Sequence, residues 1–282
     1  MIIKTKGFNL KDTITSGQCF RWTEKEDNSY TIILNDRVIN IRQNNNELII
    51  KSSDNKNLKQ KIIDYFDLKR NYDDINKEIC KKDKKMKKII ESCKGYKIMN
   101  QDSFEMCISY IISQNNNVKR ISKTIENISK NYGQKVIFNN EDYYLFPKYE
   151  DIKNISIDEL RNYGVGFRDK YIRNFLDALK ENPNLINDIN SLNTIDALKK
   201  LMIIKGIGLK VASCILLFGF RRLDVFPIDT WVKQTISTKY KIKNDTKTIE
   251  KFAKEKYGVY SALAIQYMFH YGRNVKKENE SC

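Results

Sequence analysis

The sequence has little of the chemistry on which metal-dependent and secreted proteins rely. It contains one histidine, His270, so a mechanism that needs a histidine base or a histidine metal site is nearly excluded. Its six cysteines are scattered, with no C-x-x-C pair and no cluster suited to zinc or an iron–sulfur centre. We therefore expect no cofactor, no metal, no iron–sulfur cluster, and free thiols in a reducing cytoplasm.

Signals for export and for membrane insertion are also missing. No apolar run approaches the length of a membrane span. The first ten residues lack the long apolar core and the small-residue cleavage site of a signal peptide. These absences predict a cytoplasmic protein that does not enter a membrane.

Positive charge, by contrast, is abundant. The 51 Lys and Arg residues exceed the 35 Asp and Glu residues, which gives a formal net charge of +16. Such an excess favours a polyanion through counterion release, so nucleic acid is the first candidate partner and an anionic membrane surface the second. Because the chain is also rich in Lys, Asn and Ile, part of this charge is compositional bias, and charge alone does not decide the partner.

Two kinds of periodicity divide the chain. Residues 19–51 alternate with a period near two, with turns at Asn35-Asp36 and Asn44 to Asn46, which predicts a small antiparallel sheet. After about residue 57, apolar residues recur three and four apart, as in helices. We predict an α+β fold with three parts: an N-terminal sheet-plus-helices domain (1–95), an all-helical domain (96–275) and a short polar tail (276–282). Beyond residue 57, helices are expected at 58–66, 86–93, 104–113, 118–131, 168–181, 194–202, 209–219, 229–239 and 258–271.

The most informative segment is residues 201–232. An apolar stretch ends in Lys205-Gly206-Ile207-Gly208, and a second apolar stretch begins at once. Two glycines that bracket one apolar residue make a hairpin tight enough for two helices to pack at a sharp angle. The bare backbone N–H groups at the start of the second helix suit a phosphate of a nucleic-acid strand, without reading its sequence.

Two charged residues follow this hairpin. Lys210 lies on the first turn of the second helix; taken alone it is a solvated lysine in a lysine-rich chain. Asp229 follows Phe226-Pro227-Ile228, where a helix-capping carboxylate is expected. The N–H dipoles of a helix keep such a carboxylate ionised, and an ionised carboxylate stabilises a positively charged sugar intermediate.

Together, the hairpin KGIG, the lysine after it and the downstream FPIDTW resemble the helix–hairpin–helix family of DNA glycosylases. The resemblance implies a helix–hairpin–helix core that flips a damaged base out of duplex DNA, and a protein that acts as a monomer. It also implies that Lys210 attacks C1′ and expels the base, after which a Schiff base allows β-elimination of the 3′ phosphate. Asp229 would help to deprotonate the lysine, which is nucleophilic only when neutral.

Three further segments resemble the 8-oxoguanine DNA glycosylase branch of that family. In Ser16-Gly17-Gln18-Cys19-Phe20-Arg21-Trp22, the glycine carbonyl of the branch accepts a hydrogen bond from N7–H, which guanine lacks. Asn115 occupies the position of the residue that enters the gap left by the flipped base. Arg120 and Arg168 would contact the estranged cytosine, and Phe167 would be the aromatic wedge. The resemblance therefore implies excision of 8-oxoguanine, and of related oxidised purines, opposite cytosine.

The resemblance also assigns the walls of the base pocket. Cys214 and Phe269 would sandwich the flipped purine, although both also suit core packing. Two positions depart from the branch. Ile265 stands where a base-contacting Gln is usual, and the adjacent Gln266 is about 100° away around the helix, so whether it substitutes stays open. Trp231 stands where the animal enzymes have a phosphate-contacting histidine.

Two alternatives remain at this point. An alkylpurine glycosylase on the same fold would need a wide aromatic cleft and would not need Lys210. A catalytically silent DNA-binding module would use the hairpin only to clamp a phosphate.

Overall fold

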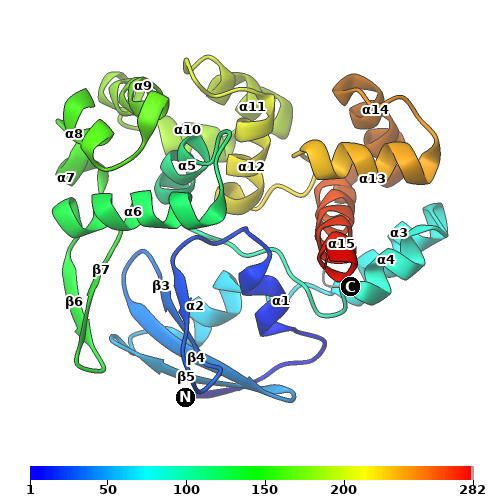
Figure 1. Ribbon diagram of the computed structural model, residues 1–282, viewed down its shortest axis with the longest axis horizontal. Coiled ribbons are helices and arrows are strands. Elements are labelled where there is room, and N and C mark those ends of the chain that lie inside the picture. The colour runs from blue at the N-terminus through cyan, green and yellow to red at the C-terminus, as the bar shows by residue number, and fades with distance from the viewer. Residues whose placement is uncertain (281–282) are drawn as a thin grey trace.

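The computed structural model describes the backbone of residues 1–280 and the side chains of residues 1–273. Figure 1 shows a small sheet, at the bottom of the view, beneath a larger body of helices. An N-terminal antiparallel sheet followed by a helical core is the fold class that the sequence predicts, and it is confirmed.

The N-terminal sheet has five antiparallel strands in the order β1-β5-β4-β3-β2. Asn45 and Asn46 form the two-residue turn that joins β4 to β5, and Asn45 has the positive φ of 51° that such turns favour. The Leu34 N–H donates a hydrogen bond to the Arg37 carbonyl (2.8 Å) across Asn35 and Asp36, so both predicted turns are present, and β1 is an additional strand. The strands are β1 Ile2–Lys4, β2 Trp22–Glu24, β3 Tyr30–Ile33, β4 Val38–Asn44 and β5 Glu47–Ser52.

One face of this sheet is covered by the first two helices, α1 Leu10–Thr15 and α2 Leu58–Tyr65. Ile32 of β3 pairs with Ile39 of β4, and both side chains are fully buried in a core to which α1 and α2 contribute Leu10, Ile14, Leu58 and Ile62. The alternation along these strands thus separates a core face from the opposite face, as the period of two predicts.

Most of the chain after residue 71 is helical, and its helices share one large core. The helices that the sequence predicts are present, and shorter or more polar ones are added between them. Their bounds are α3 Tyr72–Lys82, α4 Met86–Ser92, α5 Ser103–Ile112, α6 Val118–Tyr132, α7 Tyr149–Ile152, α8 Ile157–Asn162, α9 Asp169–Glu181, α10 Leu185–Ser191, α11 Thr194–Met202, α12 Leu209–Phe220, α13 Thr230–Tyr240, α14 Thr246–Tyr257 and α15 Ser261–Glu280, with 3-10 turns at Gly166–Arg168 and Gly258–Tyr260.

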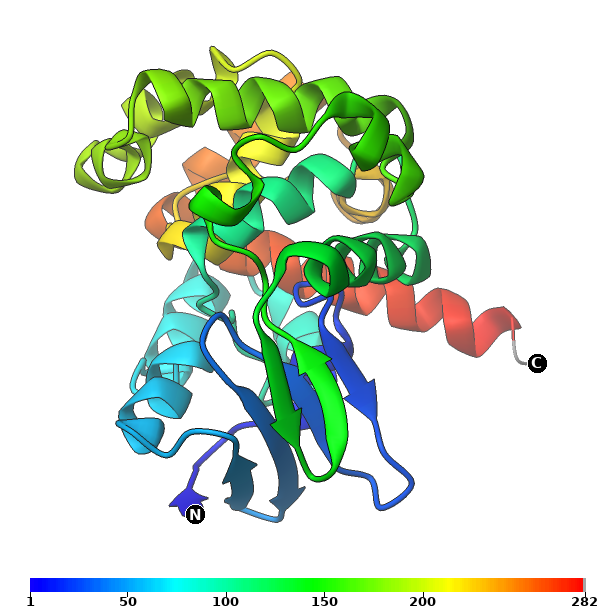
Figure 2. The ribbon, with the colours of Figure 1, turned by 90° about the vertical axis from the view of Figure 1, so that its left-hand side faces the viewer.

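The helical part contains one exception, so the expectation that it is all-helical is corrected here. Strands β6 (Lys135–Phe138) and β7 (Glu141–Tyr144) form a hairpin. Figure 2 shows this hairpin alongside the N-terminal sheet, where Phe138 and Leu145 pack on Val38 of β4. The hairpin thus covers part of the face of the sheet that α1 and α2 leave free.

Packing joins the two parts of the chain. Side chains of α3 and α4, such as Ile79 and Ile89, belong to the core of the helical body, although these helices precede the predicted boundary at residue 95. That boundary stays a prediction.

Helix α15 continues to Glu280, so it includes residues 276–280 of the predicted tail; residues 281 and 282 lie outside the described residues. Among the described residues, no helix combines the length and the apolar character needed to cross a bilayer.

Candidate active site

The predicted hairpin joins α11 to α12 and is braced from two sides. Gly206 has a φ of 105°, and a Cβ added there would lie 2.2 Å from Cγ of Tyr171, so only glycine fits. Asn174 of α9 donates a hydrogen bond to the carbonyl of Lys205 (2.9 Å), and the Gln114 amide donates one to the carbonyl of Gly206 (3.0 Å). The hairpin is therefore held rigidly against α9 and the α5–α6 loop.

The outer side of the hairpin is open. Lys205 and Gly208 are exposed, and nothing lies within 4 Å of a Cβ built on Gly208, the residue that caps α12. Ile207 is buried in the main core and anchors the turn. This arrangement leaves the first N–H groups of α12 accessible to a phosphate. Trp231 lies half-buried on the first turn of α13.

The structure brings Lys210 and Asp229 to the same cavity. Lys210 is exposed on the first turn of α12, and Asp229 caps α13 by accepting a hydrogen bond from the Val232 N–H (2.9 Å). Burial raises the pKa of Asp229, while the Val232 N–H and the charge of Lys210 act in the opposite direction. A carboxylate with a raised pKa is a stronger base, which suits removal of a proton from a neighbouring ammonium group.

The cavity itself is small, with a volume of about 90 Å³. It combines predicted site residues from the N-terminal domain, α12, α13 and α15. The residues that line it are Ser16, Gly17, Gln18, Tyr110, Lys210, Cys214, Phe218, Pro227, Asp229, Gln266 and Phe269.

One face of α12 forms a continuous wall of this cavity. Lys210, Cys214 and Phe218 follow one another at intervals of four residues and therefore point the same way. Burial raises the pKa of Cys214 to about 11, so its thiol stays protonated and presents a neutral surface. Phe218 stacks on Tyr110 with ring centroids 5.4 Å apart. These two aromatic residues were not among the predicted site residues, although the spacing from Cys214 points to Phe218.

The Gly17 loop and α15 complete the cavity. Gly17 has a φ of 92°, and Arg273 of α15 donates a hydrogen bond to the neighbouring Ser16 carbonyl (3.2 Å). Of the two candidates on α15 for contact with the base edge, Gln266 lines the cavity. Ile265 is fully buried in the main core and does not line it. Phe269, one turn beyond Ile265, is a half-buried part of the lining.

A second group of predicted residues lies around the α5–α6 loop. Phe167 is 56% exposed, as a ring available for insertion between bases would be. Asn115 is exposed at the tip of its turn with a φ of 47°. Arg120, near the start of α6, is also exposed, and its guanidinium approaches the same glycine, Gly166, as that of Arg168.

Arg168 differs from these three residues because it is only 3% exposed. Its guanidinium donates hydrogen bonds to the carbonyls of Gln114 (2.8 Å) and Asn115 (2.9 Å) and stacks over the Phe167 ring at 4.3 Å. Burial lowers the pKa of Arg168, and the charge of Arg120 adds to this effect. Arg168 therefore supports the turn that carries Asn115.

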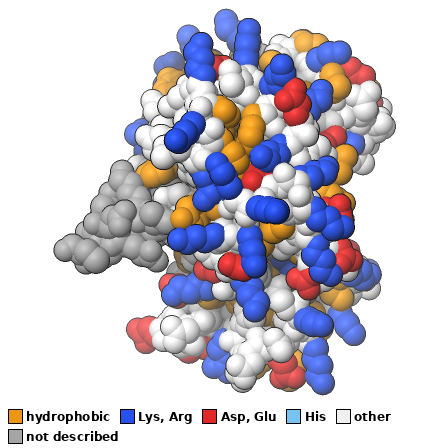
Figure 3. Space-filling model, turned by 90° about the vertical axis from the view of Figure 1, so that its right-hand side faces the viewer, with side chains coloured by type: hydrophobic (Ala, Val, Ile, Leu, Met, Phe, Trp, Pro, Cys, Tyr) orange, Lys and Arg blue, Asp and Glu red, His pale blue; other side chains and the backbone are white. Residues whose placement is uncertain are grey.

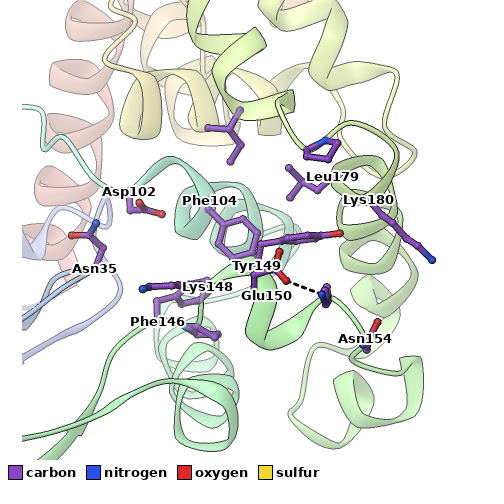
Figure 4. Close-up of a pocket in the computed structure, with 14 residues that line it drawn as sticks. Asn35, Asp102, Phe104, Phe146, Lys148, Tyr149, Glu150, Asn154, Leu179 and Lys180 are labelled. Carbon is purple, nitrogen blue, oxygen red and sulfur yellow. Dashed lines mark hydrogen bonds and ion pairs between the residues drawn. The ribbon is translucent and has the colours of Figure 1, made fainter.

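The largest of the described cavities, about 770 Å³, lies elsewhere. Figure 4 shows Phe104, Phe146 and Tyr149 around it, with Lys148 and Lys180 nearby. It lies where α5 begins and α9 ends, whereas Asn115 and Arg168 lie at the opposite ends of these helices. None of the predicted site residues lines this cavity, so volume alone does not identify the active site.

Charge and metal-binding potential complete the description of the surface. Figure 3 shows Lys and Arg side chains spread over the end of the molecule at the right of Figure 1, with fewer acidic side chains. Within the part of the chain whose side chains are described, no group of three or more His, Cys, Asp or Glu residues is arranged to hold a metal ion.

Known protein families and relatives match nearly the whole chain. Residues 1–107 match the model of the 8-oxoguanine DNA glycosylase N-terminal domain, and residues 108–258 match that of the HhH-GPD superfamily of base excision DNA repair proteins. The chain is 30% identical to a probable N-glycosylase/DNA lyase of Methanothermobacter thermautotrophicus, over 97% of this chain and 96% of that protein.

Solved structures agree with these matches. MBOgg1, solved with a low-affinity DNA ligand, is 36% identical with a TM-score of 0.92, over 98% of this chain and 96% of that chain. The 8-oxoguanine glycosylase/lyase of Clostridium acetobutylicum, solved with DNA that contains cytosine opposite 8-oxoG, is 33% identical with a TM-score of 0.91, over 98% of each chain. The chain therefore belongs to the 8-oxoguanine DNA glycosylase family of N-glycosylase/DNA lyases, within the HhH-GPD superfamily of base excision repair proteins.

Proposed function

We propose that this chain excises 8-oxoguanine from duplex DNA and cleaves the resulting abasic site, with Lys210 as nucleophile. Family membership makes it a bifunctional glycosylase and lyase of base excision repair that binds duplex DNA. The observation that carries the residue assignment is the shared cavity, in which Lys210, Asp229 and the Gly17 loop meet. A DNA clamp without chemistry would need neither the acid beside the lysine nor the cavity beside both.

The reaction begins with transfer of a proton from Lys210 Nζ to the carboxylate of Asp229. The neutral amine attacks C1′, and the glycosidic bond breaks with its electron pair leaving on the base. The departing base takes up the proton that Asp229 accepted, and the restored carboxylate stabilises the positive charge that develops on the sugar. The bond between C1′ and the ring oxygen O4′ then breaks, O4′ takes up the second proton of Nζ, and a Schiff base forms between Nζ and C1′. Water takes a proton from C2′, and the C3′–O bond breaks with its electron pair leaving on the 3′ phosphate, which completes the β-elimination.

Recognition of the lesion depends on other residues of the same cavity. The carbonyl of Gly17 accepts the N7–H donor of 8-oxoguanine, while Cys214 and Phe269 hold the purine between them. Guanine lacks that donor and leaves the acceptor unpaired, which costs about 1–3 kcal/mol. The described cavity of about 90 Å³ is smaller than ordinary ligand pockets of roughly 300 Å³ or more, so its walls separate when a purine enters. Half-buried Phe269 is the wall residue best placed to move.

Gln266 contacts the edge of the flipped base, because it lines the cavity while Ile265 faces the core. The backbone of Lys205 to Gly208, with Trp231 nearby, binds phosphates of the lesion strand. The chain acts as a monomer without a cofactor, on cytoplasmic DNA. Lys210 favours oxidised purines over alkylpurines as substrates, because an alkylpurine glycosylase on the same fold would not need this lysine.

The decisive test is Lys210→Gln. We expect this variant to bind 8-oxoG:C duplex as tightly as the unmodified protein but to lose excision and borohydride-trapped adduct entirely. Gel-shift titration measures the binding, and denaturing gels measure both the cleavage and the adduct. Lys205→Gln serves as the matched control: it removes an exposed lysine of the hairpin and retains adduct formation at saturating protein. Excision by Lys210→Gln at the unmodified rate would contradict the assignment.

We also propose that the estranged base is cytosine, read by Arg120 and Arg168. Replacing either arginine with alanine is expected to reduce the preference for 8-oxoG:C over 8-oxoG:A by about tenfold, the value of one lost contact of about 1.4 kcal/mol. Only Arg168→Ala is expected to lower the free energy of unfolding, by about 2–4 kcal/mol, since Arg168 is buried and bonded to the backbone carbonyls of three residues. Excision from all four opposite-base pairs, together with urea denaturation, tests both parts; unchanged C-to-A ratios in both variants would exclude this reading.

A further inference from the structure

The base-reading loop and the catalytic helix come from different parts of the chain, and a short segment connects them. Residues 97–103, which we call the strap, lead from the segment after α4 to the first residue of α5. Gln18, which directly follows Gly17, is 2% exposed, and its side-chain amide is fully engaged. It donates hydrogen bonds to the carbonyls of Thr13 (3.1 Å) and Lys97 (2.9 Å), and it accepts one from the Met99 N–H (2.8 Å).

On its other side the strap holds the end of α12. The last carbonyls of a helix have no partner within the helix. Here the Gln101 N–H donates to the carbonyl of Phe218 (2.9 Å), and the Ser103 hydroxyl donates to that of Gly219 (2.7 Å). The strap therefore fixes the helix that carries Lys210, near the residue that ends its cavity-lining face.

Gln101 contacts both structures at once. Its backbone N–H reaches α12, and its side-chain Nε2 donates a hydrogen bond of 2.7 Å to the Gln18 carbonyl. That carbonyl belongs to the residue next to Gly17, so one residue spans from the lesion-reading loop to the wall formed by α12. Hydrogen-bond strength falls steeply with misalignment, so a small displacement of the Gly17 carbonyl would weaken recognition of the base.

We propose that Gln101 is a positioning residue for lesion recognition, which sets the Gly17 loop at the correct distance from α12. This inference rests on the proposed function, in which Gly17 reads the base and Lys210 attacks the sugar. The two steps of the reaction should depend differently on Gln101. Excision of a damaged base needs both walls of the pocket in place, whereas cleavage of an existing abasic site needs only DNA binding and Lys210.

The test compares two substrates under single-turnover conditions: an 8-oxoG:C duplex and the same duplex with an abasic site in place of the lesion. In Gln101→Leu and in Gln101→Glu the side chain cannot donate to Gln18, while the backbone bond to Phe218 is kept. We expect excision of 8-oxoguanine to fall 10- to 100-fold in both variants, and cleavage of the abasic site to stay within twofold of the unmodified protein. Gln60→Leu, an exposed glutamine on α2, is the matched control and should change neither rate.

Each result has one reading. If the unmodified protein does not excise 8-oxoguanine, the proposed function fails, whatever the variants do. If it does and the Gln101 variants excise equally well, the positioning role is wrong while the proposed function stands. A parallel loss of both activities, or failure of both variants to fold as judged by thermal melting, would mean that Gln101 acts only on stability, and this would also overturn the inference.

Discussion

Glu105 of α5 places a carboxyl group at a pocket that Cys19 and Ile33 of the N-terminal part also line, with only 7% of its surface exposed. Burial raises the pKa of Glu105 to about 7, and nearby Arg21 opposes this rise. Arg21 is itself buried, and its Nε and Nη1 have no hydrogen-bond partner among the described residues. Between about pH 4.5 and 7 the folded chain therefore binds more protons at Glu105 than the unfolded chain does. Stability consequently falls as the pH rises through this window and levels off above it.

Glu105→Gln should remove that dependence. The free energy of unfolding of the variant, relative to the unmodified protein, should increase by about 3 kcal/mol between pH 4.5 and pH 7 and then stay constant. Urea denaturation at pH 5, 6, 7 and 8 measures the difference. Exposed Glu181→Gln is the control and should follow the unmodified protein at every pH. Parallel pH profiles for Glu105→Gln and the unmodified protein would rule out a raised pKa at this residue.

At this same scale, the sequence predicted the residues with special chemistry better than those that shape the pocket. Lys210 and Asp229 stood out because a glycine hairpin and a proline precede them, and both line the cavity. Tyr110 and Phe218 read as ordinary core positions, since an aromatic residue on an apolar helix looks the same whether it borders a cavity or not. The choice between Ile265 and Gln266 needed the orientation of α15, which depends on packing against distant helices.

Among the elements, the hairpin between α11 and α12 makes the sharpest prediction. Gly206→Ala should lower the free energy of unfolding by about 2–4 kcal/mol, since alanine is strained at a φ of 105° and its Cβ would overlap the Tyr171 ring. Gly208→Ala is the matched control two residues away. Its φ is −89° and the space around it is open, so the loss should be smaller, about 1 kcal/mol, because alanine is a weaker N-cap than glycine. Equal melting temperatures for the two variants would contradict the described geometry of the hairpin.

Which elements the sequence predicted follows from how strongly each one is patterned. The amphipathic helices α6 and α9 and the strands of the first sheet have one apolar face over enough residues to be recognised. Strands β6 and β7 have four residues each and are largely exposed, so no alternation distinguishes them. Helix α14 was also missed, because it is rich in lysine and only Ile249, Ala253 and Tyr257 are buried. Such elements are defined by burial against residues far along the chain. The local sequence pattern carries no information about that burial.

For the molecule as a whole, the net charge of +16 predicts that the affinity for DNA depends strongly on the salt concentration. If the protein neutralises about six phosphates, the affinity of Lys210→Gln for 8-oxoG:C duplex should fall roughly 10³-fold between 50 and 200 mM salt. Fluorescence anisotropy at a series of salt concentrations gives the slope. A nearly flat dependence would show that the basic surface is compositional bias, with little part in binding.

The hydrogen bond from Gln114 to the hairpin also links two regions that are proposed to contact DNA. The same residue offers its carbonyl to Arg168 beneath the Asn115 turn, so one residue joins the proposed grip on one strand to the proposed probe of the other. If these two parts keep their relative positions on binding, the cost of distortion falls on the DNA. DNA bends at the lowest cost where its base pairs already open easily. The enzyme would pause at such base pairs before it contacts the lesion.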